Sequence, residues 1–169
     1  MIELVIGGAR SGKSSHAERL AQAGGDPVVY VATGQALDAE MAERIAHHRQ
    51  RRPAHWRTVE EPVDLAGALR REDASGVCVL VDCLTLWLTN VLFAGRPEAI
   101  EDLVGTLPGL RSHVVLVSNE VGWSIVPENA LARRFRDEQG RLNQRVAAVA
   151  DRVTLVAAGL PLCLKPGGA

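Results

Sequence analysis

Two glycines, a lysine and a serine stand near the start of the chain at the spacing G-x-x-x-x-G-K-S/T. Between an apolar segment and a helix-forming one, the chain reads Gly7-Gly8-Ala9-Arg10-Ser11-Gly12-Lys13-Ser14. Glycines let the backbone curl so that successive N–H groups point at phosphate oxygens, and the start of a helix favours an anion. The pattern therefore predicts a Walker A phosphate loop that binds a nucleoside triphosphate, rather than a turn that binds nothing.

The lysine and serine of this loop have distinct roles in phosphate chemistry. Lys13 is expected to reach the β- and γ-phosphates, and the Ser14 hydroxyl to ligate Mg²⁺. A second magnesium ligand should come from a carboxylate at the end of a neighbouring strand, and Asp82 follows a run of apolar residues. This aspartate could instead cap the next helix, but beside a phosphate loop we favour the metal role. Glu120 ends another apolar run and is a second candidate, whose role as base, ligand or structural group the pattern leaves open.

Two adjacent histidines lie in a predicted helix over residues 39–51. At about 100° per residue, His48 falls on the apolar stripe of this helix, whereas His47 lies off the stripe and is expected to be accessible. An exposed histidine is in most cases only solvated. Here a cluster of arginines could hold phosphates bidentately, and a neutral imidazole beside it could attack an α-phosphate to form a covalent nucleotidyl intermediate. The cluster consists of Arg44, Arg49, Arg51 and Arg52.

A series of short strands and helices is expected to hold these side chains. Apolar runs predict strands at residues 2–6, 28–32, 58–60, 77–81 and 114–117, and a closing pair at 153–156 and 161–164. Helical patterns cover residues 13–23, 39–51, 64–71, 84–93, 98–107 and 128–151. Gly140 could bend or interrupt the last helix, and Asp38 could cap the helix of the histidines.

Strands that are apolar without polar alternation, separated by helices, are typical of a parallel sheet covered on both faces. The closing pair must be antiparallel, because its connection is too short for a parallel crossover of about a dozen residues. We therefore predict a single α/β nucleotide-binding domain over residues 1–169. Its expected class is a three-layer P-loop NTPase of the RecA-like type, with a mainly parallel central sheet and an antiparallel C-terminal edge.

Composition excludes several classes of partner. The 169 residues include 19 basic and 20 acidic side chains, for a formal net charge of −1, which attracts neither nucleic acid nor anionic lipid. No apolar run is long enough to span a membrane, and the apolar start is too short for a signal peptide, so we expect a cytoplasmic protein. Cys78, Cys83 and Cys163 lack metal-binding spacing. Cys78 and Cys163 lie in apolar runs and are expected to be buried free thiols.

Longer motifs follow the phosphate loop along nearly the whole chain. They are Tyr30-Val31-Ala32-Thr33, Asp38-Ala39-Glu40-Met41, Arg44-Ile45-Ala46-His47-His48-Arg49, Arg52-Pro53-Ala54-His55-Trp56-Arg57-Thr58-Val59-Glu60, Asp82-Cys83-Leu84-Thr85, Ser118-Asn119-Glu120-Val121-Gly122 and Ile125-Val126-Pro127-Glu128-Asn129. The R-x-x-H-H and R-P-x-H-W-R-T runs are far more specific than a phosphate loop. With these motifs the chain resembles the bifunctional adenosylcobinamide kinase / adenosylcobinamide-phosphate guanylyltransferase family of cobalamin biosynthesis.

This resemblance implies two reactions at one site. ATP or GTP, with Mg²⁺, first phosphorylates the hydroxyl of the aminopropanol arm of adenosylcobinamide. GTP then delivers GMP to adenosylcobinamide phosphate through a GMP-histidine intermediate on His47, giving adenosyl-GDP-cobinamide and pyrophosphate. The resemblance also implies a homotrimer. Beyond the phosphate loop, it places nucleotide contacts on Ala32, Thr33, Gly34, Gln50, Arg51, Arg52, Pro53, Glu60 and Asp82.

Two positions depart from the family pattern, and two other functions compete with this one. Gly34 stands where serine is expected, and Asp82 stands where some relatives have glutamate. Another small-molecule kinase of the phosphate-loop class would use Lys13, Ser14 and Asp82 but leave His47 idle. A RecA-like ATPase module acting in an assembly or on DNA is the second alternative, and the near-neutral charge disfavours its DNA-bound form.

Overall fold

A seven-stranded sheet organises the part of the chain that the computed structural model describes, which is residues 1–25, 27–36 and 38–167. The description also excludes the side chains of Glu40, Arg44, His47, His48, Arg49 and Arg51. The strands are β1 (Ile2–Gly7), β2 (Val28–Ala32), β3 (Arg57–Glu60), β4 (Cys78–Asp82), β5 (His113–Asn119), β6 (Arg152–Ala157) and β7 (Leu160–Lys165). The helices are α1 (Lys13–Gly24), α2 (Ala39–Arg51), α3 (Leu65–Glu72), α4 (Leu84–Phe93), α5 (Glu98–Thr106), the 3-10 turn η1 (Leu107–Gly109) and α6 (Ala130–Val149).

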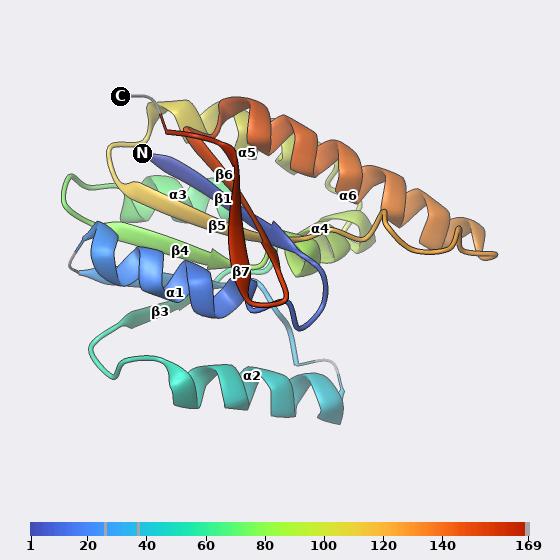
Figure 1. Ribbon diagram of the computed structural model, residues 1–169, viewed down its shortest axis with the longest axis horizontal. Helices are drawn as coiled ribbons and strands as arrows, with labels where there is room; N and C mark the ends of the chain where they lie inside the picture. Colours follow the sequence, from blue (N-terminus) through green and yellow to red (C-terminus); the bar gives the residue numbers. More distant parts are fainter. Residues whose placement is uncertain (26, 37, 168–169) are drawn as a thin grey trace.

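The sheet brings the predicted site residues to one edge. Its order is β3-β2-β4-β5-β1-β6-β7, and all neighbouring strands are parallel except the antiparallel pair of β6 and β7. This arrangement confirms the predicted mainly parallel sheet with an antiparallel C-terminal edge. Gly7 is level with Asn119 of β5, and Ala32 is level with Asp82 of β4. The carboxyl ends of these strands therefore meet (Figure 1), as they do at the ligand sites of open α/β sheets.

Helices cover both faces of the sheet and give the predicted three layers (Figure 1). On one face, Val5 and Leu80 pack with Ala17 and Ala21 of α1. On the other face, a larger core joins the sheet to α3, α4, α5 and α6 and includes the fully buried Trp87. Successive strand residues point to opposite faces of the sheet. Because helices cover both faces of the central strands, the residues on both faces are apolar, and the sequence of these strands shows no polar alternation.

The last helix differs from its predicted form. α6 begins at Ala130 rather than at residue 128, because the Asn129 side chain caps it by accepting hydrogen bonds from the N–H groups of Leu131 (2.8 Å) and Ala132 (3.2 Å). It then runs unbroken through Gly140 to Val149, and its first turns project beyond the sheet (Figure 1). None of the helices in the described residues combines the length and the apolar character needed to cross a membrane.

One burial prediction was wrong. Cys163 is exposed, and so are Leu160, Leu162 and Leu164, at 72%, 58% and 52%. All four lie on β7, which pairs with β6 and forms the edge of the sheet. An apolar run predicts burial only where helices cover the strand, and strand order is not visible in the run itself. Cys78 is buried as predicted, and burial raises the pKa of its thiol to about 12.

Candidate nucleotide-binding site

The phosphate loop connects the end of β1 to the start of α1. Gly12, the residue before the helix, has a positive φ of 94°, which glycine adopts without steric cost. A Cβ at Gly7 would lie 2.5 Å from the carbonyl oxygen of Val156, so the loop approaches β6 too closely for a side chain there. The tight curl directs backbone N–H groups and the N-terminus of α1 to one place, an arrangement that favours a phosphate.

Lys13 folds back over this loop. Its Nζ donates a hydrogen bond to the carbonyl oxygen of Gly8 at 3.1 Å. Burial lowers the pKa of the Lys13 ammonium below its usual 10.5, and the charge of Asp82 partly offsets this effect. A poorly hydrated ammonium interacts strongly with an anion, so a phosphate can replace the carbonyl oxygen as its partner.

Asp82 ends β4 and accepts a hydrogen bond from Tyr30. The phenol hydroxyl lies 3.0 Å from Oδ2 of Asp82. The N-cap position of α4 is occupied by Cys83, one residue after Asp82, which disfavours the capping role considered for Asp82. Ser14 and Asp82 offer hydroxyl and carboxylate oxygens, the ligands that Mg²⁺ prefers, and the donor set therefore fits this metal.

Glu120 turns back on its own loop. Its Oε1 accepts a hydrogen bond from the N–H of Gly122 at 2.8 Å, and its backbone N–H donates to the carbonyl oxygen of Gly7 at 3.0 Å. The half-buried carboxylate thus stabilises the turn after β5, beside the phosphate loop. This contact favours a structural role for Glu120 over that of a base.

The segment after β2 is held in place by hydrogen bonds to the end of β4. Thr33 is fully buried, and its Oγ1 both donates to the Cys83 carbonyl oxygen (2.8 Å) and accepts from the Cys83 N–H (2.9 Å). The Thr33 side chain therefore ties the ends of β2 and β4 together, and its contact with a nucleotide stays a prediction. A side chain at Gly34, where serine was expected, would place its Cβ 3.1 Å from Cδ1 of Leu86, a close approach that a small shift of the leucine would relieve.

A hollow of about 440 Å³ lies beside β3, and several of the residues predicted to contact the nucleotide line it. It is lined by Arg52, Pro53, Ala54, Trp56, Thr58 and Glu60. The Arg52 guanidinium lies 3.3 Å from the centroid of the Tyr30 ring, and its Nη1 donates to Oγ1 of Thr58 at 3.3 Å. Gln50 is exposed nearby at the end of α2. A hollow with a guanidinium, a carboxylate and an aromatic wall has the polar groups and the size to hold a nucleoside.

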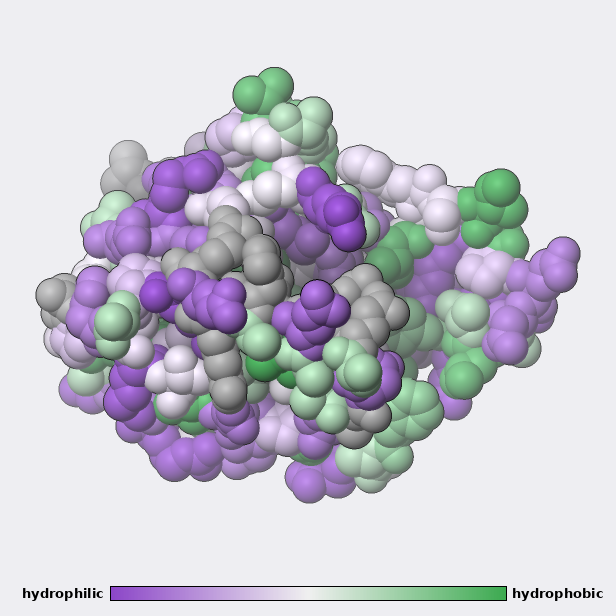
Figure 2. Space-filling model, turned by 90° about the horizontal axis from the view of Figure 1, so that it is seen from below, coloured by the Kyte–Doolittle hydropathy of each residue, from purple (hydrophilic) through white to green (hydrophobic). Residues whose placement is uncertain are grey.

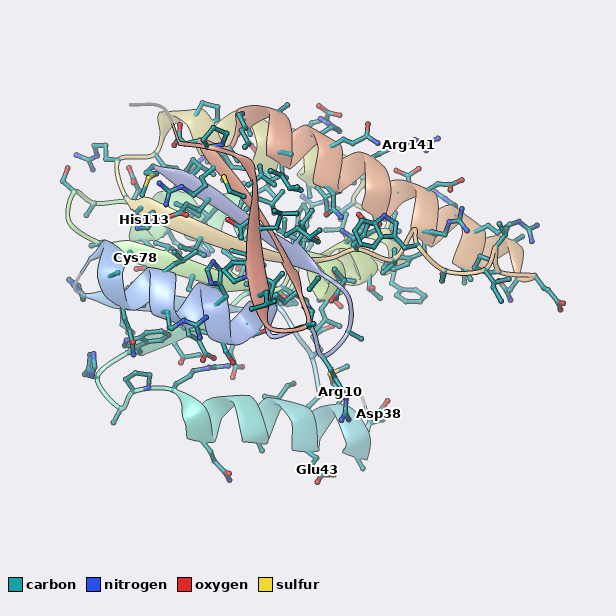
Figure 3. The ribbon with its side chains drawn as sticks, in the orientation of Figure 1. Arg10, Asp38, Glu43, Cys78, His113 and Arg141 are labelled. Atoms are coloured by element: carbon teal, nitrogen blue, oxygen red, sulfur yellow. The ribbon has the colours of Figure 1, made fainter. Side chains whose placement is uncertain are left out.

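α2 carries the predicted nucleophile. Asp38 caps the helix as predicted, since its Oδ1 accepts from the Met41 N–H at 2.7 Å. Met41 and Ile45 are half-buried, in agreement with the predicted apolar stripe. Arg10 extends from the phosphate loop toward the start of this helix, whereas Glu43 points away from the rest of the molecule (Figure 3). The side chains of His47 and Arg51 lie outside the described residues, and their roles stay predictions.

Solved structures share the fold over nearly the whole chain. The flagellar accessory protein FlaH from Methanocaldococcus jannaschii aligns with 98% of this chain and 78% of its own, at a TM-score of 0.52 and 13% identity. An ATPase from the type III secretion system of pathogenic bacteria aligns with 96% of this chain and 56% of its own, at a TM-score of 0.56 and 12% identity. At such low identity the likeness concerns the fold alone, which is that of the RecA-like P-loop NTPases.

Sequence comparison identifies the family. The family described as cobinamide kinase / cobinamide phosphate guanyltransferase matches residues 3–164. The chain belongs to this family. It is similar to the bifunctional adenosylcobalamin biosynthesis protein CobP of Pseudomonas aeruginosa, with 54% identity over 172 residues, 98% of either chain. The bifunctional protein CobU of Salmonella typhimurium is 48% identical over 183 residues, which is 98% of this chain and 100% of that one.

Two features of this cobinamide kinase / cobinamide phosphate guanyltransferase were not predicted. The first is the turn between β6 and β7, whose Gly159 N–H donates to the Ser11 carbonyl oxygen at 2.8 Å and so braces the phosphate loop. The Ala158-Gly159 pair predicted a turn but not what the turn touches. The second is the contact of Tyr30 with Asp82. Its only signal was a phenol hydroxyl in an otherwise apolar strand.

Proposed function

We propose that this enzyme phosphorylates adenosylcobinamide with ATP or GTP and then transfers GMP from GTP to adenosylcobinamide phosphate, through a GMP-histidine intermediate on His47. The family match over residues 3–164 carries the proposal. The site supports it, because the phosphate loop follows β1 at the edge of the sheet where β4 ends in Asp82, and α2 leads directly into Arg52 and Pro53, which line the hollow. The product is adenosyl-GDP-cobinamide, an intermediate of cobalamin biosynthesis.

In the phosphoryl transfer, the chain positions the triphosphate and neutralises its charge. The loop from Gly7 to Ser14 holds the β- and γ-phosphates with backbone N–H groups, and Lys13 exchanges the Gly8 carbonyl oxygen for a phosphate oxygen. Ser14 and Asp82 would hold Mg²⁺, which supplies charge neutralisation at the phosphates when bound. The substrate hydroxyl attacks the γ-phosphorus in line and releases its proton to water, while the new P–O bond forms and the bond to the leaving nucleoside diphosphate breaks.

In the nucleotidyl transfer, His47 is the nucleophile. A neutral ring nitrogen attacks the α-phosphorus of GTP, a P–N bond forms, and the bond to pyrophosphate breaks. A phosphate oxygen of adenosylcobinamide phosphate then attacks the same phosphorus, and the P–N bond breaks to return the electron pair to the ring. Arg52, Pro53 and Glu60 would hold the nucleoside in the hollow, with Gln50, Arg51 and the segment from Ala32 to Gly34 beside it.

We also propose that the protein acts as a homotrimer in the cytoplasm. The exposed apolar side chains of β7 support self-association, since monomeric soluble proteins rarely expose a contiguous apolar patch of this kind. The edge strand also presents an unpaired ladder that another chain can cover. Sedimentation of the purified protein tests this proposal, and a monomer at working concentrations would contradict it.

Covalent labelling tests the proposed function most directly. The protein is incubated with GTP labelled at the α-phosphate and Mg²⁺, and the adduct is located by mass spectrometry. Acid-labile, base-stable label on His47 is expected, and it should vanish in His47→Ala while phosphorylation of adenosylcobinamide persists. His55→Ala, a change at another histidine nearby, should keep the label.

The labelling experiment and a hydrolysis assay with added polynucleotide separate the alternatives. An unlabelled protein that still phosphorylates a small alcohol is a simple kinase of the phosphate-loop class. Strong stimulation of nucleotide hydrolysis by a polynucleotide would instead favour a RecA-like ATPase module. Either result would overturn the two-step reaction.

A further inference from the structure

Three side chains from separate segments form a row between the hollow and the phosphate loop. Arg52, one residue beyond α2, covers the ring of Tyr30 at 3.3 Å from its centroid. The hydroxyl at the other end of that ring donates to Asp82 Oδ2 at 3.0 Å. The row thus connects a group that lines the hollow with the carboxylate that would hold magnesium.

Strand register explains why Tyr30 can reach this position. Tyr30 is level with Leu80, and Ala32 is level with Asp82. Because alternate residues share a face, Tyr30, Leu80 and Asp82 all point to the side of the sheet that α1 covers. Tyr30 is 2% exposed, so its hydroxyl has little access to water and depends on the carboxylate as its acceptor.

The phenol hydroxyl acts as a donor to Asp82, whose Oδ2 lies 3.0 Å away. A neutral phenol has one hydrogen to donate. Its bond to Oδ2 therefore fixes the rotation of the Asp82 carboxylate about Cβ–Cγ.

We propose that Tyr30 is a positioning residue that orients Asp82 for the magnesium–nucleotide complex, and that Arg52 links this contact to occupancy of the hollow. A guanidinium over the ring face is attracted to it and draws electron density from the phenol, which strengthens the hydrogen bond to Asp82. A nucleotide that fills the hollow while Arg52 stays over the ring keeps that bond strong. Part of this inference rests on the proposed function, since that assigns magnesium to Asp82.

Magnesium titration of nucleotide binding tests the inference without relying on turnover. Binding of a fluorescent, non-hydrolysable GTP analogue is measured against Mg²⁺ concentration, and again in EDTA. Tyr30→Phe keeps the ring and removes the hydroxyl. It should raise the half-saturating Mg²⁺ concentration about tenfold, as the loss of partners of metal ligands commonly does. Binding in EDTA should not change.

Asp82→Asn separates failure of this inference from failure of the magnesium assignment. If Asp82→Asn shifts the Mg²⁺ dependence and Tyr30→Phe does not, Tyr30 is no positioning residue. If neither variant shifts it while the wild type binds the analogue, the assignment of magnesium to Asp82 is itself wrong, and the inference falls with it.

Arg52→Ala tests the link to the hollow. This variant is informative even if Tyr30→Phe fails to fold. It should raise the half-saturating Mg²⁺ concentration severalfold. In the double variant the shift should equal that of Tyr30→Phe, because Arg52 acts through the hydroxyl, and coupled residues give non-additive effects. Additive shifts, or no shift in Arg52→Ala, would overturn the link. Thermal melting checks that each variant is folded.

Discussion

The two helices that flank the predicted nucleotide, α1 and α2, are held very differently. α1 packs against β1, β4, β5 and β6 and buries Ala17 and Ala21 completely. Among the described side chains of α2, in contrast, the best covered are Met41 and Ile45, which are only half-buried. Seen from the side of α2, the surface is a mixture of hydrophilic and small hydrophobic areas (Figure 2).

This difference matches the two reactions that we propose. Phosphoryl transfer depends on preorganised groups that do not move during the reaction, and α1 presents Lys13 and Ser14 from a rigid base. Nucleotidyl transfer needs His47 to meet an α-phosphorus while GTP enters and pyrophosphate leaves. A lightly packed helix can move for these steps at low cost. The molecule thus combines a firmly packed helix at the phosphate loop with a lightly packed helix that carries the proposed nucleophile.

The largest expected effect concerns the fixed part. Lys13→Ala should reduce kcat/KM of both transfers by about 10²–10³-fold, the usual cost of losing a donor that stabilises developing charge. Rates are measured separately with adenosylcobinamide and with adenosylcobinamide phosphate. Arg19→Ala, an exposed cation on the same helix, is the matched control and should leave both rates unchanged. If the His47 adduct formed at the wild-type rate in Lys13→Ala, the two helices would not share one triphosphate.

The free energy of unfolding should fall more when the core under α1 is truncated than when α2 is. Leu80→Ala, in the core under α1, should lower the free energy of unfolding by about 2–5 kcal/mol. Ile45→Ala should lower it by about 1 kcal/mol or less, because its side chain is only half-buried. Urea titration measures both. Formation of the His47 adduct should nevertheless fall more in Ile45→Ala than the small stability loss explains. Equal destabilisation by the two changes would show that α2 is as well packed as the core.

The sequence predicts best those elements whose signals are local. β2, α2 and α4 have the predicted bounds residue for residue, because apolar periodicity, a capping aspartate and a stopping proline are local signals. The phosphate loop is equally local, since all of its groups come from one short run. Asp82 was placed near it because parallel strands end at one edge of a sheet.

What could not be predicted depends on contacts between distant segments. Tyr30 and Asp82 are 52 residues apart, and only the pairing of β2 with β4 brings them together. Gly159 braces Ser11 because β6 lies beside β1. The exposure of Cys163 follows from the place of β7 at the edge. Each of these facts requires strand order, which no local pattern contains.

Hydrogen exchange compares the helices without mutation. Backbone amides of α2 should exchange at least about ten times faster than those of α1, because local opening costs less where few apolar contacts are lost. Mass spectrometry of peptides covering residues 13–24 and 39–51 measures the ratio. Addition of GTP and Mg²⁺ should slow exchange in α2 more than in α1. Equal protection of the two helices in the nucleotide-free protein would show that α1 and α2 are equally well packed.

The smallest expected effect is a pH dependence of nucleotide affinity, which arises from Lys13 at the phosphate loop. Burial lowers the pKa of Lys13 below 10.5, so the free protein loses this charge at a lower pH than an exposed lysine would. Nucleotide affinity should be complete below that lowered pKa and fall as pH rises through it, because phosphate binding requires the protonated form. We expect a severalfold loss that begins at a lower pH than the 10.5 of an ordinary lysine would allow, measured with the fluorescent analogue. Lys13→Arg keeps its charge throughout this range and corrects for ionisation of the nucleotide. Parallel pH profiles for wild type and Lys13→Arg would mean that Lys13 stays charged, and that burial at the phosphate loop is weaker than its packing implies.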